Sequence, residues 1–511
     1  MNPVASIVAV LLVAFASLAV GVVGLRVSRR ASDFFVASRG VGPVLNASAI
    51  SGEYLSAASF LGVAGLILVR GADMLWLPVG WTAGYLLLLV FVAAPLRRSG
   101  AYTLPDFAQL RVESLNARRV SSVLVVAIGM LYLIPQFQGA GLTLHTLTGA
   151  PSWVGQLIVA VVVGLSVLPG GMRSVTLVQA FHYWLKLVAL LTPVFFFLAA
   201  ISSDAAPIRT GSLDVADWVE PLTGEYSLYL TYSLVLATFF GAMGLPHVVV
   251  RFYTNRDGRA ARRTTLVVLV LLGGFYLLPI AYGVLGRMFA FDLVAAGRAD
   301  SVVLELPSRL LDGPLAQGLT ALLAAGAFAA FLSTSTGLVV SVAGVLSQDV
   351  IRWGGEHRQV ISAFRLSTIL AVTLAAFMTG VSASVPVAHA VELAFAVAAS
   401  TFCPMLLLGI WWRGLTSVGV IAGLVVGGSL SMVAVVATTF GIVGEGWAGA
   451  VLAQPAAVTM PTAFVTMVVV SLLTRQHRPK HVSQTMVRLH APEHLTLNRG
   501  PFHPVGSTAR R

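Results

Sequence analysis

Residues 48–60 read SAISGEYLSAASF and stand in the middle of an apolar segment long enough to cross a membrane. Gly52 weakens a helix, and the adjacent Glu53 opposes insertion into lipid. Backbone carbonyls freed by a helix break are costly in lipid, so a break persists only where it lines a cavity or holds an ion. The stretch therefore predicts the discontinuous helix of a secondary transporter. The simpler alternative is a packing glycine beside a snorkelling glutamate.

The composition places the whole chain in the membrane. Of 511 residues, 57% are hydrophobic and 10% are charged, against about 25% charged in soluble proteins. Runs of ~20 apolar residues recur, and no alternating pattern of a transmembrane barrel is present. We predict an all-α polytopic protein of thirteen spans: 4–25, 43–69, 74–96, 120–147, 152–170, 177–201, 227–250, 264–286, 315–347, 360–381, 385–411, 415–440 and 456–474.

The basic residues predict the orientation. With the amino terminus outside, 26 of the 32 Lys and Arg residues lie in inner loops, their adjoining span ends and the carboxy-terminal tail, as the positive-inside rule requires. The first span carries its cationic cluster after it (Arg26, Arg29 and Arg30), so we expect it to remain as a membrane span rather than to be a cleaved signal. We expect a cell-membrane protein with a cytoplasmic carboxy terminus. The +12 net charge then reflects topology rather than nucleic-acid binding.

Enzyme motifs are absent. The chain has no phosphate-binding loop, no His-Glu-x-x-His and no nucleophile elbow. We therefore expect no enzymatic activity and no cofactor, with transport driven by an ion gradient. A single cysteine, Cys403, excludes a disulfide framework. We expect short surface helices in loops 202–226 and 287–314, and a poorly ordered tail from 475 to 511, which contains five histidines but no regular metal-ligand spacing.

A second polar motif lies in residues 326–349, GAFAAFLSTSTGLVVSVAGVLSQD. Ala330, Ser333 and Thr334 stand at i, i+3 and i+4, on one face of a helix. Two hydroxyls and a carbonyl there, with two carbonyls from a broken helix, would make five neutral oxygens. Such a set suits a monovalent cation, because Ca²⁺ and Mg²⁺ favour carboxylates. Alternatively, the hydroxyls bond to their own helical turn.

At these motifs the sequence resembles the sodium/solute symporter family, and within it the acetate permease branch. The resemblance covers about residues 1–480. Its stretches are SDFFVASRGVGPVLNASAISGEYLSAASFLG (32–62), RRSGAYTLPDFAQLR (97–111), YLIPQFQGAG (132–141), GLPHVVVRFYT (244–254), STSTGLVVSVAGVLSQD (333–349) and AFAVAASTFCPMLLLGIWWRG (394–414). The segments GEYLSAASF, YLIPQFQGAG and GLPH are those that indicate the monocarboxylate branch.

The resemblance implies a LeuT-like core of two inverted five-helix repeats. The expected segments are a first helix with a basic cytoplasmic loop (1–42), the first repeat (43–201), an extracellular acidic loop (202–226), the second repeat (227–411), two peripheral helices (412–474) and the tail (475–511).

The resemblance also implies a sodium site. Its ligands would be the carbonyls of Gly52, Leu55 and Ala330 and the hydroxyls of Ser333 and Thr334. The spacing from Ser333 to Asp349 matches the family's distance between the hydroxyl pair and a cytoplasmic acid.

Substrate residues are expected beside the two helix breaks and on the fourth span. They are Ser51, Glu53, Ser56, Tyr132, Gln136, Thr238 and Gly241, with Gln138 as a further neutral donor. Interhelical hydrogen bonding is the alternative for each. The chain lacks the polar side chains of the sugar and proline members around 238–246, where Phe239, Phe240 and Met243 are apolar. A small ligand with a short alkyl end fits this region.

Ionisable residues within spans are functional candidates. An ionised Glu53 would repel a carboxylate substrate by roughly 4 kcal/mol at ~4 Å and a dielectric of ~20. We therefore expect Glu53 to be protonated, turned away or paired with a cation. Lys186 could pair with an acid or with the substrate, or snorkel from a span end. His389 and Glu392 form an i, i+3 pair that we interpret as structural rather than as a proton relay.

The sequence thus predicts a monomeric transporter in a lipid bilayer. Its expected activity is cation-coupled symport, with Na⁺ as the favoured ion, of a short-chain monocarboxylate such as acetate, propionate or pyruvate. The alternatives are a sodium symporter for proline, urea or pantothenate, and proton-coupled monocarboxylate uptake. A passive channel or a sensor would lack a coupled ion site or would need a signalling domain.

Overall fold

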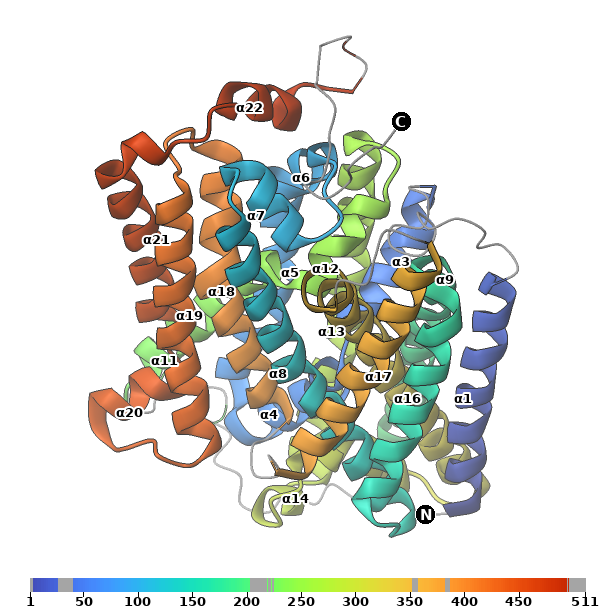
Figure 1. Ribbon diagram of the computed structural model, residues 1–511. Helices are drawn as coiled ribbons and strands as arrows, with labels where there is room; N and C mark the ends of the chain where they lie inside the picture. Colours follow the sequence, from blue (N-terminus) through green and yellow to red (C-terminus); the bar gives the residue numbers. More distant parts are fainter. Residues whose placement is uncertain are drawn as a thin grey trace.

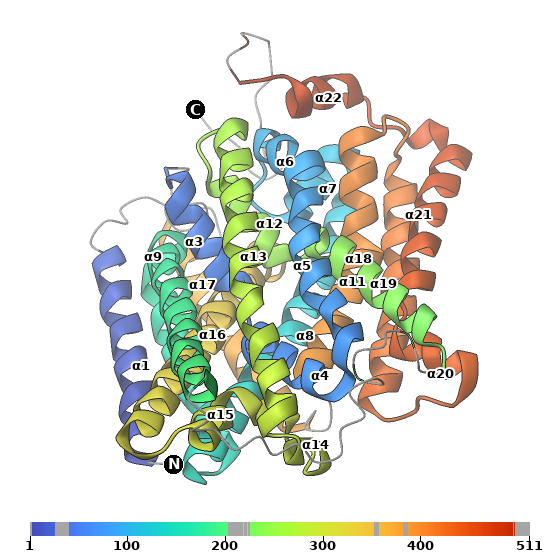
Figure 2. The same cartoon turned by 180° about the vertical axis from the view of Figure 1, so that it is seen from behind.

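The computed structural model describes residues 3–25, 40–202, 218, 222, 225–351, 357–381, 387–493 and 495. These residues form helices, turns and connections, with no strand among them. Figures 1 and 2 show long helices running side by side, with α14 and α20 at one end of the bundle and α22 across the other. This is the arrangement expected when backbone polar groups must be satisfied within each crossing segment.

The described residues up to Gly244 contain nine α-helices. They are α1 (Pro3–Leu25), α3 (Pro43–Tyr54), α4 (Val63–Arg70), α5 (Trp76–Leu87), α6 (Ala93–Ser99), α7 (Leu104–Val112), α8 (Leu115–Thr148), α9 (Ser152–Ser202) and α11 (Ser227–Gly244). Single π-helical turns, η2 (Ala58–Gly62) and η4 (Leu88–Val92), precede α4 and α6, and a 3₁₀ turn, η3 (Gly71–Leu75), joins α4 to α5.

The second half continues the bundle. It contains α12 (Pro246–Val250), α13 (Gly258–Phe289), α14 (Asp292–Ala295), α15 (Val302–Leu310), α16 (Gly313–Val345), α17 (His357–Val381), α18 (Val387–Trp411), α19 (Ser417–Thr439), α20 (Gly446–Ala453), α21 (Ala456–Leu473) and α22 (Val482–His490). Four short helical turns lie between or after these helices. Three are 3₁₀ turns, η5 (Arg251–Thr254), η6 (Ala299–Ser301) and η8 (Arg475–His477), and one is a π-helical turn, η7 (Leu346–Val350).

Eleven described segments are long and apolar enough to cross a membrane, against thirteen predicted. Two predicted spans account for the difference. The second span is divided between α3, which is 12 residues long, and the segment Ala58–Ser99, which also contains the third span. The fifth and sixth predicted spans both lie within the single helix α9, whose part Ser152–Leu168 is apolar but shorter than the crossing length. The other helices follow the predicted ranges, and the broken second span is itself a reason for the lower number.

Two helices are interrupted near the middle of the bundle. Between α3 and η2, Leu55 leaves the helical conformation, with φ −74° and ψ 88°. Between α11 and α12, Leu245 is extended, with φ −71° and ψ 117°, and Pro246 opens the next helix. Figures 1 and 2 place α3 in the half of the molecule nearer α22 and α4 in the half nearer α14.

The central helix of the bundle is α16, which packs against α9, α8, α1 and α3. Nearly every residue of α16 from Leu323 onward is buried, including its hydroxyl residues. The polar motif of this helix therefore faces protein on all sides, as functional intramembrane polar groups generally do.

The tail differs from the prediction. Residues 475–493 are described and include α22, which packs on α6 and α7. Met486 and Leu489 are buried beneath it, and Glu493 pairs with Arg98 at 3.3 Å. The expectation of a poorly ordered tail is therefore wrong for this part, because two apolar side chains and an ion pair dock it. The loop 287–314 contains α14, η6 and α15, as predicted; most of loop 202–226 lies outside the described residues.

Candidate functional site

The break after α3 leaves backbone groups that other helices satisfy. The N–H of Leu55 donates back to the Ser51 carbonyl at 3.0 Å, while the N–H of Ala57 donates to Oε1 of Gln136 on α8 at 2.9 Å. Gln136 therefore caps the second half of the broken helix. Ser56 lies at the break itself and is fully buried.

The two predicted hydroxyls of α16 reach this break. The Ser333 hydroxyl donates to the carbonyl of Gly52 at 2.6 Å and lies 3.1 Å from the carbonyl of Ala330. The Thr334 hydroxyl donates to the carbonyl of Glu53 at 2.6 Å. The face formed by residues 330, 333 and 334 is thus the face that contacts α3, as their helical spacing predicts.

A third helix completes the arrangement. Nζ of Lys186, on α9, donates to the carbonyls of Gly52 at 2.5 Å and Leu55 at 2.7 Å and to the Ser333 hydroxyl at 3.0 Å. Lys186 is 0% exposed, so the snorkelling alternative is wrong. The ammonium lies among three of the five oxygens that were predicted to bind sodium.

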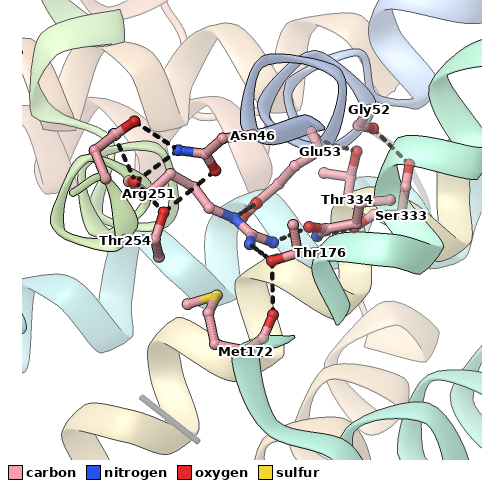
Figure 3. A network of polar contacts seen from close by, with 11 residues as sticks. Asn46, Gly52, Glu53, Met172, Thr176, Arg251, Thr254, Ser333 and Thr334 are labelled. Atoms are coloured by element: carbon pink, nitrogen blue, oxygen red, sulfur yellow. Dashed lines mark hydrogen bonds and ion pairs between the residues drawn. The ribbon is translucent and has the colours of Figure 1, made fainter. Parts of the chain in front are cut away.

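The carboxylate of Glu53 forms a buried ion pair. Nε of Arg251 lies 2.6 Å from its Oε2, and both side chains are at most 2% exposed. The other guanidinium nitrogens donate to the Thr176 hydroxyl at 2.9 Å and to Oε1 of Gln179. Figure 3 shows this network running from α3 to α9 and η5. Glu53 is thus paired with a cation, one of its three expected states, and this removes most of its repulsion toward an anion.

Gly52 has a different role from the one expected. The helix α3 continues through it to Tyr54, so the break lies at residues 55 and 56, and the prediction that Gly52 itself unwinds the helix is wrong. A Cβ at residue 52 would overlap the backbone carbonyl of Gln179 on α9. The glycine therefore allows α3 and α9 to approach closely, which places Lys186 within reach of the break.

Two predicted substrate residues on α11 contact neighbouring helices. The Thr238 hydroxyl donates to the carbonyl of Leu234 at 2.8 Å and packs against Gly80 of α5. At Gly241, a Cβ would overlap the carbonyl of Phe395 on α18. In the described structure both positions hold α11 against α5 and α18.

An aromatic cluster surrounds Phe395, next to the break. The ring centroid of Phe395 lies 6.1 Å from that of Tyr54, 5.6 Å from Trp81 and 5.9 Å from Tyr132. Three further rings join the cluster: Tyr276, Tyr85 and His247, which lie 5.8 Å from Trp81, 4.9 Å from Tyr54 and 5.2 Å from Tyr132, respectively.

Several polar atoms of this cluster are buried without a partner. In the described part of the chain, Nε1 of Trp81, the hydroxyl of Tyr85 and both ring nitrogens of His247 make no hydrogen bond, and the hydroxyl of Ser51 on α3 also makes none. A buried polar group without a partner costs about 1–3 kcal/mol. Such a concentration of unsatisfied donors is expected where a ligand supplies the missing acceptors.

A cavity of about 440 Å³ lies at the α20 end of the bundle. Its charged lining comes from Arg70, Asp73, Glu225, Arg287, His389 and Glu392. His389 and Gln454 both contact Oε2 of Glu392, at 3.2 and 3.0 Å. The predicted His389–Glu392 pair thus stands in the wall of this cavity.

Sequence comparison identifies the family. Residues 34–427 match the model of the sodium:solute symporter family. The chain belongs to the sodium:solute symporter family. It is therefore a multi-pass membrane transporter and not an enzyme.

Two relatives of this symporter cover most of its length. A Bacillus subtilis (strain 168) protein named "Uncharacterized symporter YwcA" is 32% identical over 412 residues, which are 78% of this chain and 80% of the relative. A Corynebacterium glutamicum protein named "Monocarboxylic acid transporter" is 31% identical over 482 residues, which are 86% of this chain and 87% of the relative.

Solved structures confirm the LeuT-like fold with its five-plus-five inverted repeats. A Na⁺-coupled sialic acid symporter in a substrate-bound outward-open state superposes with a TM-score of 0.71 at 14% identity, covering 92% of this chain and 98% of that one. The transporter Mhp1 of the nucleobase-cation-symport-1 family, closed around bromovinylhydantoin, gives a TM-score of 0.56 at 13% identity, covering 90% and 99%.

Several groups at the centre of the symporter were not assigned from its sequence. Trp81, Tyr85, Tyr276, His247 and Phe395 come from four different helical segments, and aromatic residues in apolar spans are common enough to give no signal. In the sequence, Arg251 is one of several basic residues near the end of a predicted span, and nothing distinguishes it from the others. The predicted residues do better: Ser51 lies in α3 one turn before the break, and Tyr132 belongs to the aromatic cluster.

Proposed function

We propose that this symporter takes up a short-chain monocarboxylate, such as acetate, propionate or pyruvate, together with a monovalent cation. The relative named as a monocarboxylic acid transporter supports the substrate class. The broken helices support alternating access around a central site, the general mechanism of transporters with inverted repeats.

The unpartnered donors of the aromatic cluster are the observation that carries this proposal. Nε1 of Trp81 and the hydroxyl of Tyr85 can donate to the two oxygens of a carboxylate. Phe395 and Tyr54 provide an apolar wall that suits a short alkyl end. Because Arg251 already pairs with Glu53, the substrate is held by neutral donors, which lets it leave again on the other side.

The cavity near α20 is proposed as the outer entrance, and the α22 end as cytoplasmic. The helices α6 and α7, which carry Arg97, Arg98 and Arg111, lie at the same end of the bundle as α22, which carries Arg488. This concentration agrees with the positive-inside rule. Arg70 and Arg287, in the wall of the cavity, would attract an anion from the opposite side.

Uptake of labelled pyruvate into proteoliposomes tests the substrate class, because the neutral acid form of pyruvate is scarce and leaks little. Excess acetate or propionate is expected to suppress the uptake, whereas proline, urea and pantothenate are not. Suppression by proline or urea with no effect of the short acids would contradict the proposal and favour another substrate of the same family.

The donors can be tested individually. Tyr85→Phe and Trp81→Phe each remove one donor, and a hydrogen bond to a charged group contributes about 1.5–3 kcal/mol. We therefore expect the KM for pyruvate to rise about tenfold or more in each variant. Tyr232→Phe is the matched control, since Tyr232 is 63% exposed on α11. An unchanged KM in both cluster variants would place the substrate elsewhere.

A further inference from the structure

Lys186 occupies the position where the sequence predicts a sodium ion. Its three ammonium hydrogens have three acceptors: the carbonyls of Gly52 and Leu55 and the hydroxyl of Ser333. An ammonium has three donors and no acceptor, so this set satisfies it completely. The same oxygens cannot at once coordinate a second cation, because two positive charges at this distance would repel strongly.

The cation at this position is a lysine rather than an arginine. The chain has 32 basic residues, and only Lys186 and Lys480 are lysines. Arginine stays protonated and presents a flat fork, whereas lysine carries a point charge and can release its proton in a buried site. A buried ion is expensive unless its surroundings compensate for the lost water, and here backbone oxygens do so.

Among the residues that the structure describes, no carboxylate binds Lys186 directly. Glu53 on α3 is the nearest acid to influence it, but Glu53 is already bound to Arg251 of η5. The other titratable neighbour is His182, one turn earlier on α9, whose Nε2 lies 2.7 Å from the Ser17 hydroxyl of α1. The ammonium is therefore held by the oxygens of the break, in the manner of a bound metal cation.

We propose that the protonated side chain of Lys186 is the coupling cation of this symporter, so that uptake is driven by protons and does not require Na⁺. The inference rests on the proposed monocarboxylate transport and names its coupling ion. It replaces Na⁺, the ion favoured from the sequence, with the alternative of proton coupling.

In each transport cycle Lys186 takes up one proton on the outer side and releases it on the inner side. From the outer side the neutral amine of Lys186 takes up one proton and becomes the ammonium, which ties α3 to α9 and α16 through Gly52, Leu55 and Ser333. The carboxylate then binds and the core reorients. On the inner side the ammonium releases one proton, and its amine, with only two hydrogens, no longer satisfies the three oxygens. One proton and one monovalent anion cross together, with no net charge moved.

The wild-type protein gives the first test. Proteoliposomes in Na⁺-free choline buffer receive an inward proton gradient of one pH unit, with protein-free vesicles measuring leak. One-to-one coupling predicts that pyruvate accumulates about tenfold at equilibrium, since one unit corresponds to 1.36 kcal/mol. We expect added Na⁺ and an imposed membrane potential to change nothing, and an uncoupler to abolish the accumulation.

Lys186→Met gives the second test. Without the amine, we expect at least a fivefold loss of gradient-driven accumulation, while exchange of internal for external pyruvate persists. Lys480→Met, on the exposed tail, is the matched control and should behave as wild type. If Lys186→Met does not fold, Lys186→Ala and the wild type are compared for thermal stabilisation by NaCl over choline chloride. The wild type should show none, and Lys186→Ala, whose oxygens are free, should gain several degrees.

Three results would overturn the inference: wild-type uptake that needs a Na⁺ gradient, Na⁺ stabilisation of the wild-type protein, or proton-driven accumulation that survives in Lys186→Met. These results leave the proposed substrate class intact. Failure of the wild-type protein to move pyruvate under any gradient would instead contradict the proposed function, and the inference with it.

Discussion

At the scale of single residues, Gly52 shows how one missing side chain brings two helices together. A Cβ there would overlap the Gln179 carbonyl, so Gly52→Ala must push α3 away from α9. Overpacking of this kind costs about 1–3 kcal/mol, and it also withdraws the Gly52 carbonyl from Lys186. We expect a lower Tm in a detergent melt and a loss of pyruvate uptake.

Gly273→Ala is the matched control for this residue. It lies inside α13, and a Cβ there meets nothing within 4 Å. Because alanine favours a helix over glycine by about 0.5–1 kcal/mol, this variant should be as stable as the wild type or slightly more so. Equal stability and activity of Gly52→Ala would show that α3 and α9 can separate without consequence.

At the scale of helical elements, the Glu53–Arg251 pair joins α3 to η5. The helix α3 ends at the first break, and η5 follows α12, the short helix after the second break. Removing one partner of a buried pair leaves an uncompensated charge and costs about 3–5 kcal/mol. Glu53→Gln and Arg251→Met should each lower stability strongly, while the double variant should recover much of the loss. The double-mutant cycle is measured from Tm in detergent. Purely additive losses would mean that the two side chains do not act as a pair.

At the scale of the whole molecule, Glu493 docks the tail across the α22 end. Partial burial alone would raise the pKa of its carboxyl, but the N–H of Gly258 and the guanidinium of Arg98 together hold that pKa below its usual value. Its contribution to docking is therefore complete above the unfolded pKa of about 4.3 and is lost as the pH falls through the lower folded value.

Hydrogen exchange of residues 482–490 measures this docking. We expect high protection, measured relative to the intrinsic exchange rate at each pH, at pH 5–7, and lower protection when the tail is released at lower pH or by Glu493→Ala. Glu445→Ala, at the start of α20 on the opposite end, is the control and should leave α22 protected. Equal protection in Glu493→Ala would show that the other contacts of the tail, among them buried Met486 and Leu489 and the hydrogen bond from Arg98 to the His490 carbonyl, are sufficient to hold it.

The sequence predicted the features that follow from periodicity and length. A membrane crossing needs ~20 apolar residues, so most spans could be placed, and the 3.6-residue repeat was enough to select Ser333 and Thr334 as the face toward α3. The partner of that face could not be predicted. Lys186 lies more than a hundred residues from both Gly52 and Ser333, and hydropathy does not reveal which turn of α9 meets the break. The helix α22 was missed because its nine residues bury only two apolar side chains.

In the proposed mechanism a lysine ammonium, and not a sodium ion, fills the oxygen cage at the helix break. Cryo-electron microscopy of the protein in lipid nanodiscs, with high NaCl in one sample and choline chloride in the other, tests it most directly. We expect continuous side-chain density from Lys186 to within ~3 Å of the Gly52 and Leu55 carbonyls in both samples. An isolated ion between α3 and α16 in the NaCl sample alone, with Lys186 turned away from the break, would contradict it.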